Sequence, residues 1–243
     1  LPIYGQKQID SETVKTVKVE EQAHLQDDTV SPTCQITIDY SYLAKSDAAD
    51  SIVQRINRTI QAHILGKEYT RMNPEVAVDS FKNTYINNYR KDVNEFYQED
   101  IKNGTPKDEL PTWYNYEYGL TTYFSEGKEG ILNFIAETFE YTGGAHPNSW
   151  NKWMNFEKNT GKLLALKDVF MAGSEKPISD MLLEELITEM ATRLEDSSIT
   201  SLEGLQNAGI LNSTNMYVPD NFLLEKEKVS FLYNKYDIAP YAV

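Results

Sequence analysis

The chain has 243 residues, 40% hydrophobic and 25% charged, which excludes a disordered chain, a collagen-like repeat and a disulfide-rich miniprotein. Its 37 acidic and 23 basic residues give a net charge of −14, and no run of three basic residues occurs, so we expect neither nucleic-acid binding nor attraction to an anionic membrane surface. A cationic protein would be attracted, although solubility alone also accounts for such a charge.

The N-terminal part predicts two strands followed by two helices. Residues 14–20 favour a short strand, and residues 34–42 alternate between apolar and polar side chains, as in a half-buried antiparallel strand. Cys34, the only cysteine, lies on the apolar side of this alternation, so we expect a buried thiol and no intrachain disulfide.

Both helices are predicted from the spacing of apolar residues. The first has Asp47 as a cap, isoleucines at every fourth position and a stop at Gly66. The second begins at Asn73 and Pro74 and ends near Gly104. Its expected apolar stripe is Val78, Phe81, Tyr85, Tyr89, Val93 and Phe96.

The rest of the chain favours strands with one more long helix. Residues 114–124 and 131–141 predict a hairpin whose second strand is central, and residues 149–157 predict a further strand. A helix is expected at 177–195, mostly loop at 196–218, and two short strands at 221–224 and 229–233.

This order predicts an α+β fold with antiparallel sheet packed by about three helices. We place the domains at 1–142 and 143–243, with a boundary near 143–148, or else as one intimate unit.

Several motifs resemble a known bacterial pair of domains. Residues 141–146 read Tyr-Thr-Gly-Gly-Ala-His, residues 166–170 read Leu-Lys-Asp-Val-Phe, and residues 236–242 read Tyr-Asp-Ile-Ala-Pro-Tyr-Ala. In this order they resemble the RsiV/PdaC-like extracytoplasmic domain pair, whose C-terminal member is a domain of unknown function. The resemblance implies a place outside the cytoplasmic membrane, often as a lipoprotein, and a binding role that in RsiV is directed at lysozyme. The first residue is not Met, so we expect a trimmed or mature chain.

The candidate ligand-binding residues lie around the loop at 143–147. Two adjacent glycines allow a ligand to approach the backbone, or simply permit a tight turn. Aromatic side chains with polar tips suit protein interfaces and sugar stacking, or else belong to the core. Trp150 and Trp153 have opposite parity, so at most one of them faces the core. The candidate set is Tyr141, Gly143, Gly144, His146, Trp150 and Trp153.

Catalytic and metal chemistry receives little support from the sequence. The three histidines, His24, His63 and His146, have no metal-ligand spacing, so we expect no metal and no cofactor. If the protein were an enzyme, Glu137 and Glu140 would be its candidate carboxylates.

We therefore expect a non-catalytic extracytoplasmic binding module at the bacterial cell envelope. Its ligand would be a cationic protein such as a lysozyme, or a cell-wall glycan. The alternative is a carboxylate-based hydrolase that acts on envelope glycans.

Overall fold

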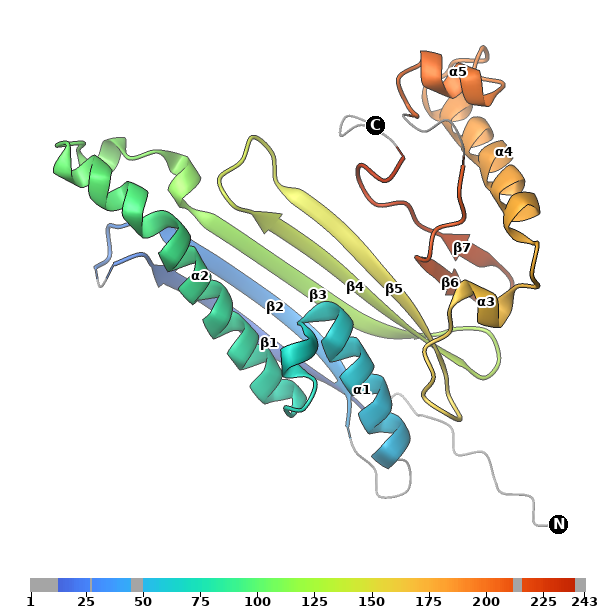
Figure 1. The fold of residues 1–243 in the computed structure, drawn as a ribbon, viewed down its shortest axis with the longest axis horizontal. Coiled ribbons are helices and arrows are strands. Elements are labelled where there is room, and N and C mark those ends of the chain that lie inside the picture. The colour runs from blue at the N-terminus through green and yellow to red at the C-terminus, as the bar shows by residue number, and fades with distance from the viewer. Residues whose placement is uncertain (1–12, 27, 45–49, 212–215, 239–243) are drawn as a thin grey trace.

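A five-stranded sheet forms the centre of the computed structural model, which describes residues 13–26, 28–44, 50–211 and 216–238 (Figure 1). The strands lie side by side in chain order. They are β1 (Val14–His24), β2 (Thr33–Leu43), β3 (Tyr116–Glu126), β4 (Ile131–Tyr141) and β5 (Asn148–Glu157). The predicted α+β class is confirmed, and β4 is a central strand as predicted.

One strand pair departs from the predicted antiparallel arrangement. β2 and β3 are parallel, whereas the other three pairs of this sheet are antiparallel. The chain between β2 and β3 contains α1 (Asp50–Ile64) and α2 (Pro74–Lys102). A crossover of this length returns the chain to the same end of the sheet, which a short hairpin cannot do. The sheet is therefore mixed.

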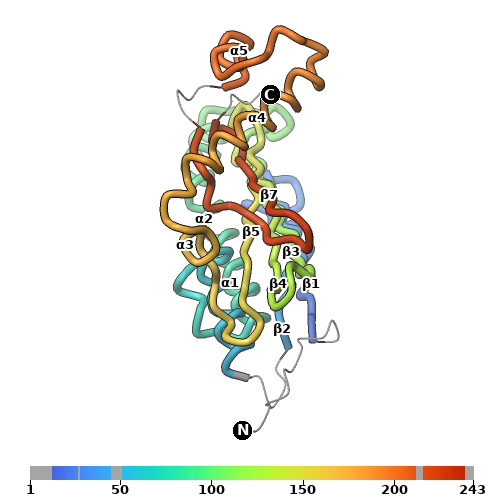
Figure 2. Tube along the Cα trace, turned by 90° about the vertical axis from the view of Figure 1, so that its right-hand side faces the viewer, coloured from blue at the N-terminus to red at the C-terminus, as the bar shows by residue number. Residues whose placement is uncertain are grey.

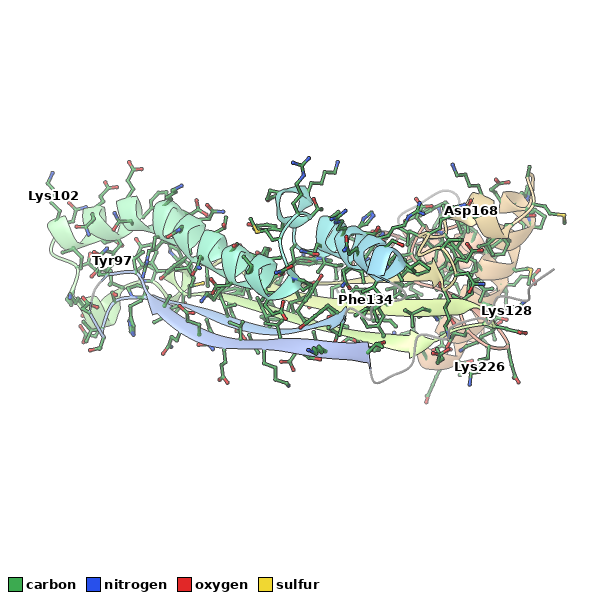
Figure 3. All side chains as sticks on the ribbon, turned by 90° about the horizontal axis from the view of Figure 1, so that it is seen from below. Tyr97, Lys102, Lys128, Phe134, Asp168 and Lys226 are labelled. Carbon is green, nitrogen blue, oxygen red and sulfur yellow. The ribbon has the colours of Figure 1, made fainter. Side chains whose placement is uncertain are left out.

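Both long N-terminal helices cover the same face of the sheet (Figure 3). The predicted apolar side of β2 is buried beneath them: Cys34, Ile36, Ile38 and Tyr40 are fully inaccessible. In α2, Val78, Tyr89 and Val93 are buried as predicted, but Phe96 is 52% exposed. Tyr97 takes the buried position, because the last turns of α2 present the neighbouring side chain to the core.

Burial makes Cys34 a test of the fold. Removal from water raises the pKa of its thiol to about 12, because the low-dielectric core disfavours the thiolate. We expect a maleimide to leave the native protein unmodified at about pH 8 and to modify one thiol per chain in guanidinium. Mass spectrometry of both samples measures this, and rapid labelling of the native protein would contradict the assigned position of β2.

The C-terminal part of the chain lies on the β5 side of the sheet (Figures 1 and 2), and some of its elements pack around a second, smaller core. It contains α3 (Leu166–Val169), α4 (Glu175–Arg193), α5 (Leu202–Asn207) and the hairpin β6 (Phe222–Leu224)–β7 (Val229–Phe231). α5 is a short helix of six residues within the range 196–218, for which the sequence predicts mostly loop. The Ser201 hydroxyl caps this short helix by accepting from the Gly204 N–H. Its two leucines, the buried Leu205 and the partly buried Leu202, pack against the second core, and six residues are too few to show a helical period.

β5 joins the two parts of the chain. It lies C-terminal to the expected boundary near 143–148, and it pairs with β4 along its full length, from Glu140–Asn148 to Ile131–Glu157. Its outer edge faces the C-terminal segment. The domain boundary stays a prediction, and the structure shows that the sheet continues across it.

Candidate functional site

Two asparagine side chains attach the C-terminal segment to the edge of β5. The Asn221 amide accepts from the Trp153 N–H at 2.7 Å and donates to the Asn151 carbonyl at 2.8 Å. The Asn234 amide accepts from the Asn151 N–H at 2.7 Å and donates to the same carbonyl at 3.1 Å. Each amide offers a donor and an acceptor side by side, so it substitutes for a neighbouring strand and satisfies an otherwise open sheet edge.

A third asparagine attaches the β6–β7 hairpin. Asn155 of β5 is buried, and its amide donates to the Phe222 carbonyl and accepts from the Leu224 N–H, both at 2.8 Å. Asn133, its partner across the sheet, donates to the Leu224 carbonyl at 3.3 Å. The amides of β4 and β5 thus fix β6, and with it the position of the segment that follows α5.

This attachment leaves a pocket of about 450 Å³ between the end of α1, β5 and the C-terminal segment. We call it the joint pocket. Among its lining residues are His63, Trp150, Lys152, Tyr217, Asp220 and Asp237. Trp150 and Lys152 alternate with Asn151 along β5, so both project from one face of the sheet. The pocket therefore combines the aromatic side chains of Trp150 and Tyr217 with groups of both charges.

The charges of the joint pocket are separate rather than paired. Within the described residues, neither Lys152 nor Asp220 makes an ion pair or a side-chain hydrogen bond. Asp237 accepts from the Asn234 N–H at 2.7 Å. Burial, together with the positive charges of Lys152 and Lys67, lowers the pKa of His63 below its usual value, which favours the neutral imidazole at neutral pH. The pocket thus offers an unpaired ammonium, an unpaired carboxylate and a neutral imidazole.

The structure separates the predicted site residues into two places. Trp150 lines the joint pocket, and Trp153 lies three positions further along β5, on the opposite face. Both tryptophans are half-buried, so neither belongs to the core. The remaining candidates, Tyr141, Gly143, Gly144 and His146, lie at the turn between β4 and β5 and do not line the joint pocket. Their role in ligand binding stays a prediction.

Gly143 has a clear structural role at that turn. Its φ is +81°, and a Cβ built on it would lie 2.2 Å from the Trp113 carbonyl oxygen. Gly130 has a similar φ of +79° but open space around its missing side chain. The two glycines therefore share a backbone conformation and differ in the close approach of a neighbouring segment.

Gly143→Ala is expected to lower the free energy of unfolding by roughly 2 kcal/mol more than Gly130→Ala. Both substitutions strain a left-handed backbone, but only the first also pushes against the backbone of Trp113. Urea unfolding of the two variants measures the difference. Equal losses would show that the contact with Trp113 relaxes without cost.

The two glutamates proposed for an enzyme do not form a pair. Glu137 and Glu140 are three residues apart on β4, which places them on opposite faces of the strand. Glu140 accepts from the Tyr85 hydroxyl of α2 at 2.9 Å, whereas Glu137 accepts from the Tyr123 hydroxyl on the other face at 3.3 Å. Their carboxylates cannot act on one bond together. Asp220 and Asp237, by contrast, both line the joint pocket.

Two further findings concern metals and membranes. The part of the chain that the structure describes contains no group of three or more His, Cys, Asp or Glu side chains arranged to hold a metal ion. No helix in the same described ranges has the length and apolar character that crossing a bilayer requires.

The chain matches two families, in the order predicted from the motifs. Residues 29–149 match the family described as Deacetylase PdaC, and residues 167–243 match the Protein of unknown function (DUF3298). The chain has the PdaC–DUF3298 arrangement. The resemblance found in the sequence is therefore confirmed. No curated protein matches the chain in sequence.

Two solved structures resemble this chain over most of its length. A member of the DUF3298 family from Bacteroides fragilis is 29% identical, with a TM-score of 0.83 over 94% of this chain and 86% of that chain. A DUF3298 family protein from Pseudomonas aeruginosa is 16% identical, with a TM-score of 0.60 over 94% of this chain and 85% of that chain. The second likeness concerns the fold alone.

Most residues of the joint pocket were not predicted from the sequence. His63 has no metal-ligand spacing to another histidine, and Lys152 and Asp220 belong to no distinguishing pattern in the sequence. Asp237 lies within the closing motif that carried the resemblance, and Asn221 directly precedes β6. The sequence signal for Asp237 and Asn221 is therefore their place within or directly beside a recognisable motif or strand.

Proposed function

We propose that the protein is a non-catalytic binding module outside the cytoplasmic membrane of a bacterial cell, and that the joint pocket binds a saccharide unit of a cell-wall glycan. The observation that carries the proposal is the pocket itself, in which the Trp150 ring stands beside polar groups. A sugar ring has an apolar C–H face and polar hydroxyl edges. An aromatic face with a few placed polar groups is the matching arrangement.

The polar groups of the pocket define which contacts a saccharide would make. Asp220 accepts from hydroxyls, Lys152 donates to hydroxyls or to an amide carbonyl, and neutral His63 does either. None of these groups has to break an existing ion pair to bind, because none is formed within the described residues. The location outside the membrane is carried over from the family resemblance. Fractionation of cells that express the full-length gene tests it, and recovery in the cytosol would refute it.

Titration calorimetry with N-acetylglucosamine oligomers and with muropeptides tests glycan binding. We expect at least one of them to bind, and Trp150→Ala to weaken that binding by about tenfold or more, since 1.4 kcal/mol corresponds to a factor of ten. Trp113→Ala is the matched control, because Trp113 is 37% exposed and lies outside the joint pocket. The proposal fails if no glycan binds, or if both variants lose the same affinity.

One observation supports the alternative function, a carboxylate-based hydrolase of envelope glycans: Asp220 and Asp237 both line the joint pocket. A pair of carboxyl groups is what glycoside hydrolysis uses. Incubation with the same glycans and measurement of new reducing ends separates the two functions. Turnover that Asp220→Asn abolishes would replace the binding proposal, and binding without turnover supports it.

A further inference from the structure

A second, largely apolar pocket lies between α3 and the first turns of α4, and it shares one lining residue, Asp220, with the joint pocket. Its volume is about 370 Å³, and Leu166, Phe170, Met171 and Ile178 line it. Met171 is 83% exposed, although it is one of the more apolar side chains of the chain. Exposure of flexible methionines beside an apolar hollow is typical of surfaces that adapt to a protein partner.

The apolar surface continues along α4. Ile178 and Leu182 are four residues apart, and Met181 stands beside them with 65% of its surface exposed. Of the whole helix, Met190 alone is buried, with Leu183, Leu186 and Ile187 partly covered by the second core. Figure 1 shows α4 at the outer side of the C-terminal part, away from the large sheet. Part of its apolar surface therefore has no partner within the described residues.

The same side of α4 is acidic. Glu185 and Glu189 lie one turn apart and are both exposed. Lys176–Asp180 is the one ion pair that α4 makes within the described part of the chain, so the carboxylates of Glu185 and Glu189 are not neutralised there. Of the charged residues that line the apolar pocket, Glu175 and Asp220 are acidic and Lys167 is basic, so acidic groups are in excess there as well. We call this surface the α4 groove and define it as Leu166, Phe170, Met171, Ile178, Met181 and Leu182, with Glu175, Glu185 and Glu189 beside them.

We infer that the α4 groove binds a basic amphipathic helix of a partner protein, independently of the glycan proposal. Apolar side chains spaced along one helix face fill the groove, and Lys or Arg side chains at their flanks meet the unpaired glutamates. The negative charge beside the groove favours a basic helix over two other occupants, a second copy of this chain and an anionic lipid surface. A second copy would place its own glutamates against these, and anionic lipid would be repelled in the same way.

A pair of designed peptides tests this inference with the full chain. The first is a helix of about 18 residues, or five turns, with leucines on one face and lysines at their flanks, and the second carries glutamates in place of the lysines. Fluorescence anisotropy should show binding of the basic peptide that weakens with salt, and no binding of the acidic one. Equal binding of both peptides, or binding of neither, would overturn the inference.

Charge-matched variants separate the α4 groove from the net charge of −14. Glu185→Gln with Glu189→Gln is expected to reduce affinity for the basic peptide about fivefold, as two flanking ion pairs are lost. Glu95→Gln with Glu99→Gln removes the same charge from an exposed side of α2 and should change affinity less than about twofold. Met181→Ser should weaken binding, and Met72→Ser, outside the groove, should not. Equal effects of the two double variants would refute a local site.

Discussion

Asn155→Ala is expected to lower the free energy of unfolding by roughly 2–6 kcal/mol, because two buried backbone groups of β6 lose their partners at about 1–3 kcal/mol each. The Phe222 carbonyl and the Leu224 N–H both bind the Asn155 amide, in a place that water does not reach. The β6–β7 hairpin is short, with three residues in each strand, and cannot hold its position alone. Loss of one side chain should therefore loosen the attachment of the C-terminal part.

Urea unfolding followed by tryptophan fluorescence measures this loss, since Trp150 and Trp153 lie on the strand that carries Asn155. Asn155→Asp keeps the acceptor for the Leu224 N–H but loses the donor to the Phe222 carbonyl and introduces a buried charge, so it should be at least as damaging. Asn148→Ala, at the exposed start of β5, is the control and should change stability by less than about 0.5 kcal/mol. A similar small loss for Asn155→Ala would show that the hairpin is held by its apolar contacts.

Elements with strong local patterns could be predicted from the sequence, and the pairing between distant elements could not. The alternation at 34–42 and the apolar stripe of α2 set which side chains face inward, and the burial of Ile36, Ile38 and Val93 follows from them. The parallel pairing of β2 with β3 depends on how the intervening helices cross the sheet, which no local period encodes. α5 is stabilised by the second core and by one cap, so its sequence alone shows almost no period.

The joint pocket was hard to predict for a related reason. Its residues come from α1, from β3–β5 and from a segment more than 60 residues further along, and they meet only because Asn221 and Asn234 bind the edge of β5. An asparagine that substitutes for a strand has the same sequence appearance as an asparagine in a turn. The Gly-Gly motif was easier to see. At Gly143 the structure gives it a packing role against Trp113, and the ligand role predicted for this loop remains to be tested.

A second large loss of stability is expected at Phe134 of β4. Phe134 is fully buried and lies between the helices and the sheet, as Figure 3 shows. Its ring packs edge-on against Phe124 of the neighbouring strand, with 5.0 Å between the ring centres. Phe134→Ala removes these contacts and leaves a cavity in a strand held on both sides, where the backbone can collapse little. Such substitutions cost about 3–5 kcal/mol.

Phe139→Ala is the matched control for Phe134→Ala, because Phe139 lies on the opposite face of the same strand and its ring is only half-buried. Its loss should be clearly smaller, since a partly exposed ring gives up less buried area and leaves no closed cavity. Urea midpoints for both variants, with circular dichroism to confirm retained secondary structure, measure the difference. Equal losses would contradict this account, because they would show that the half-buried Phe139 ring contributes as much to stability as the fully buried Phe134 ring.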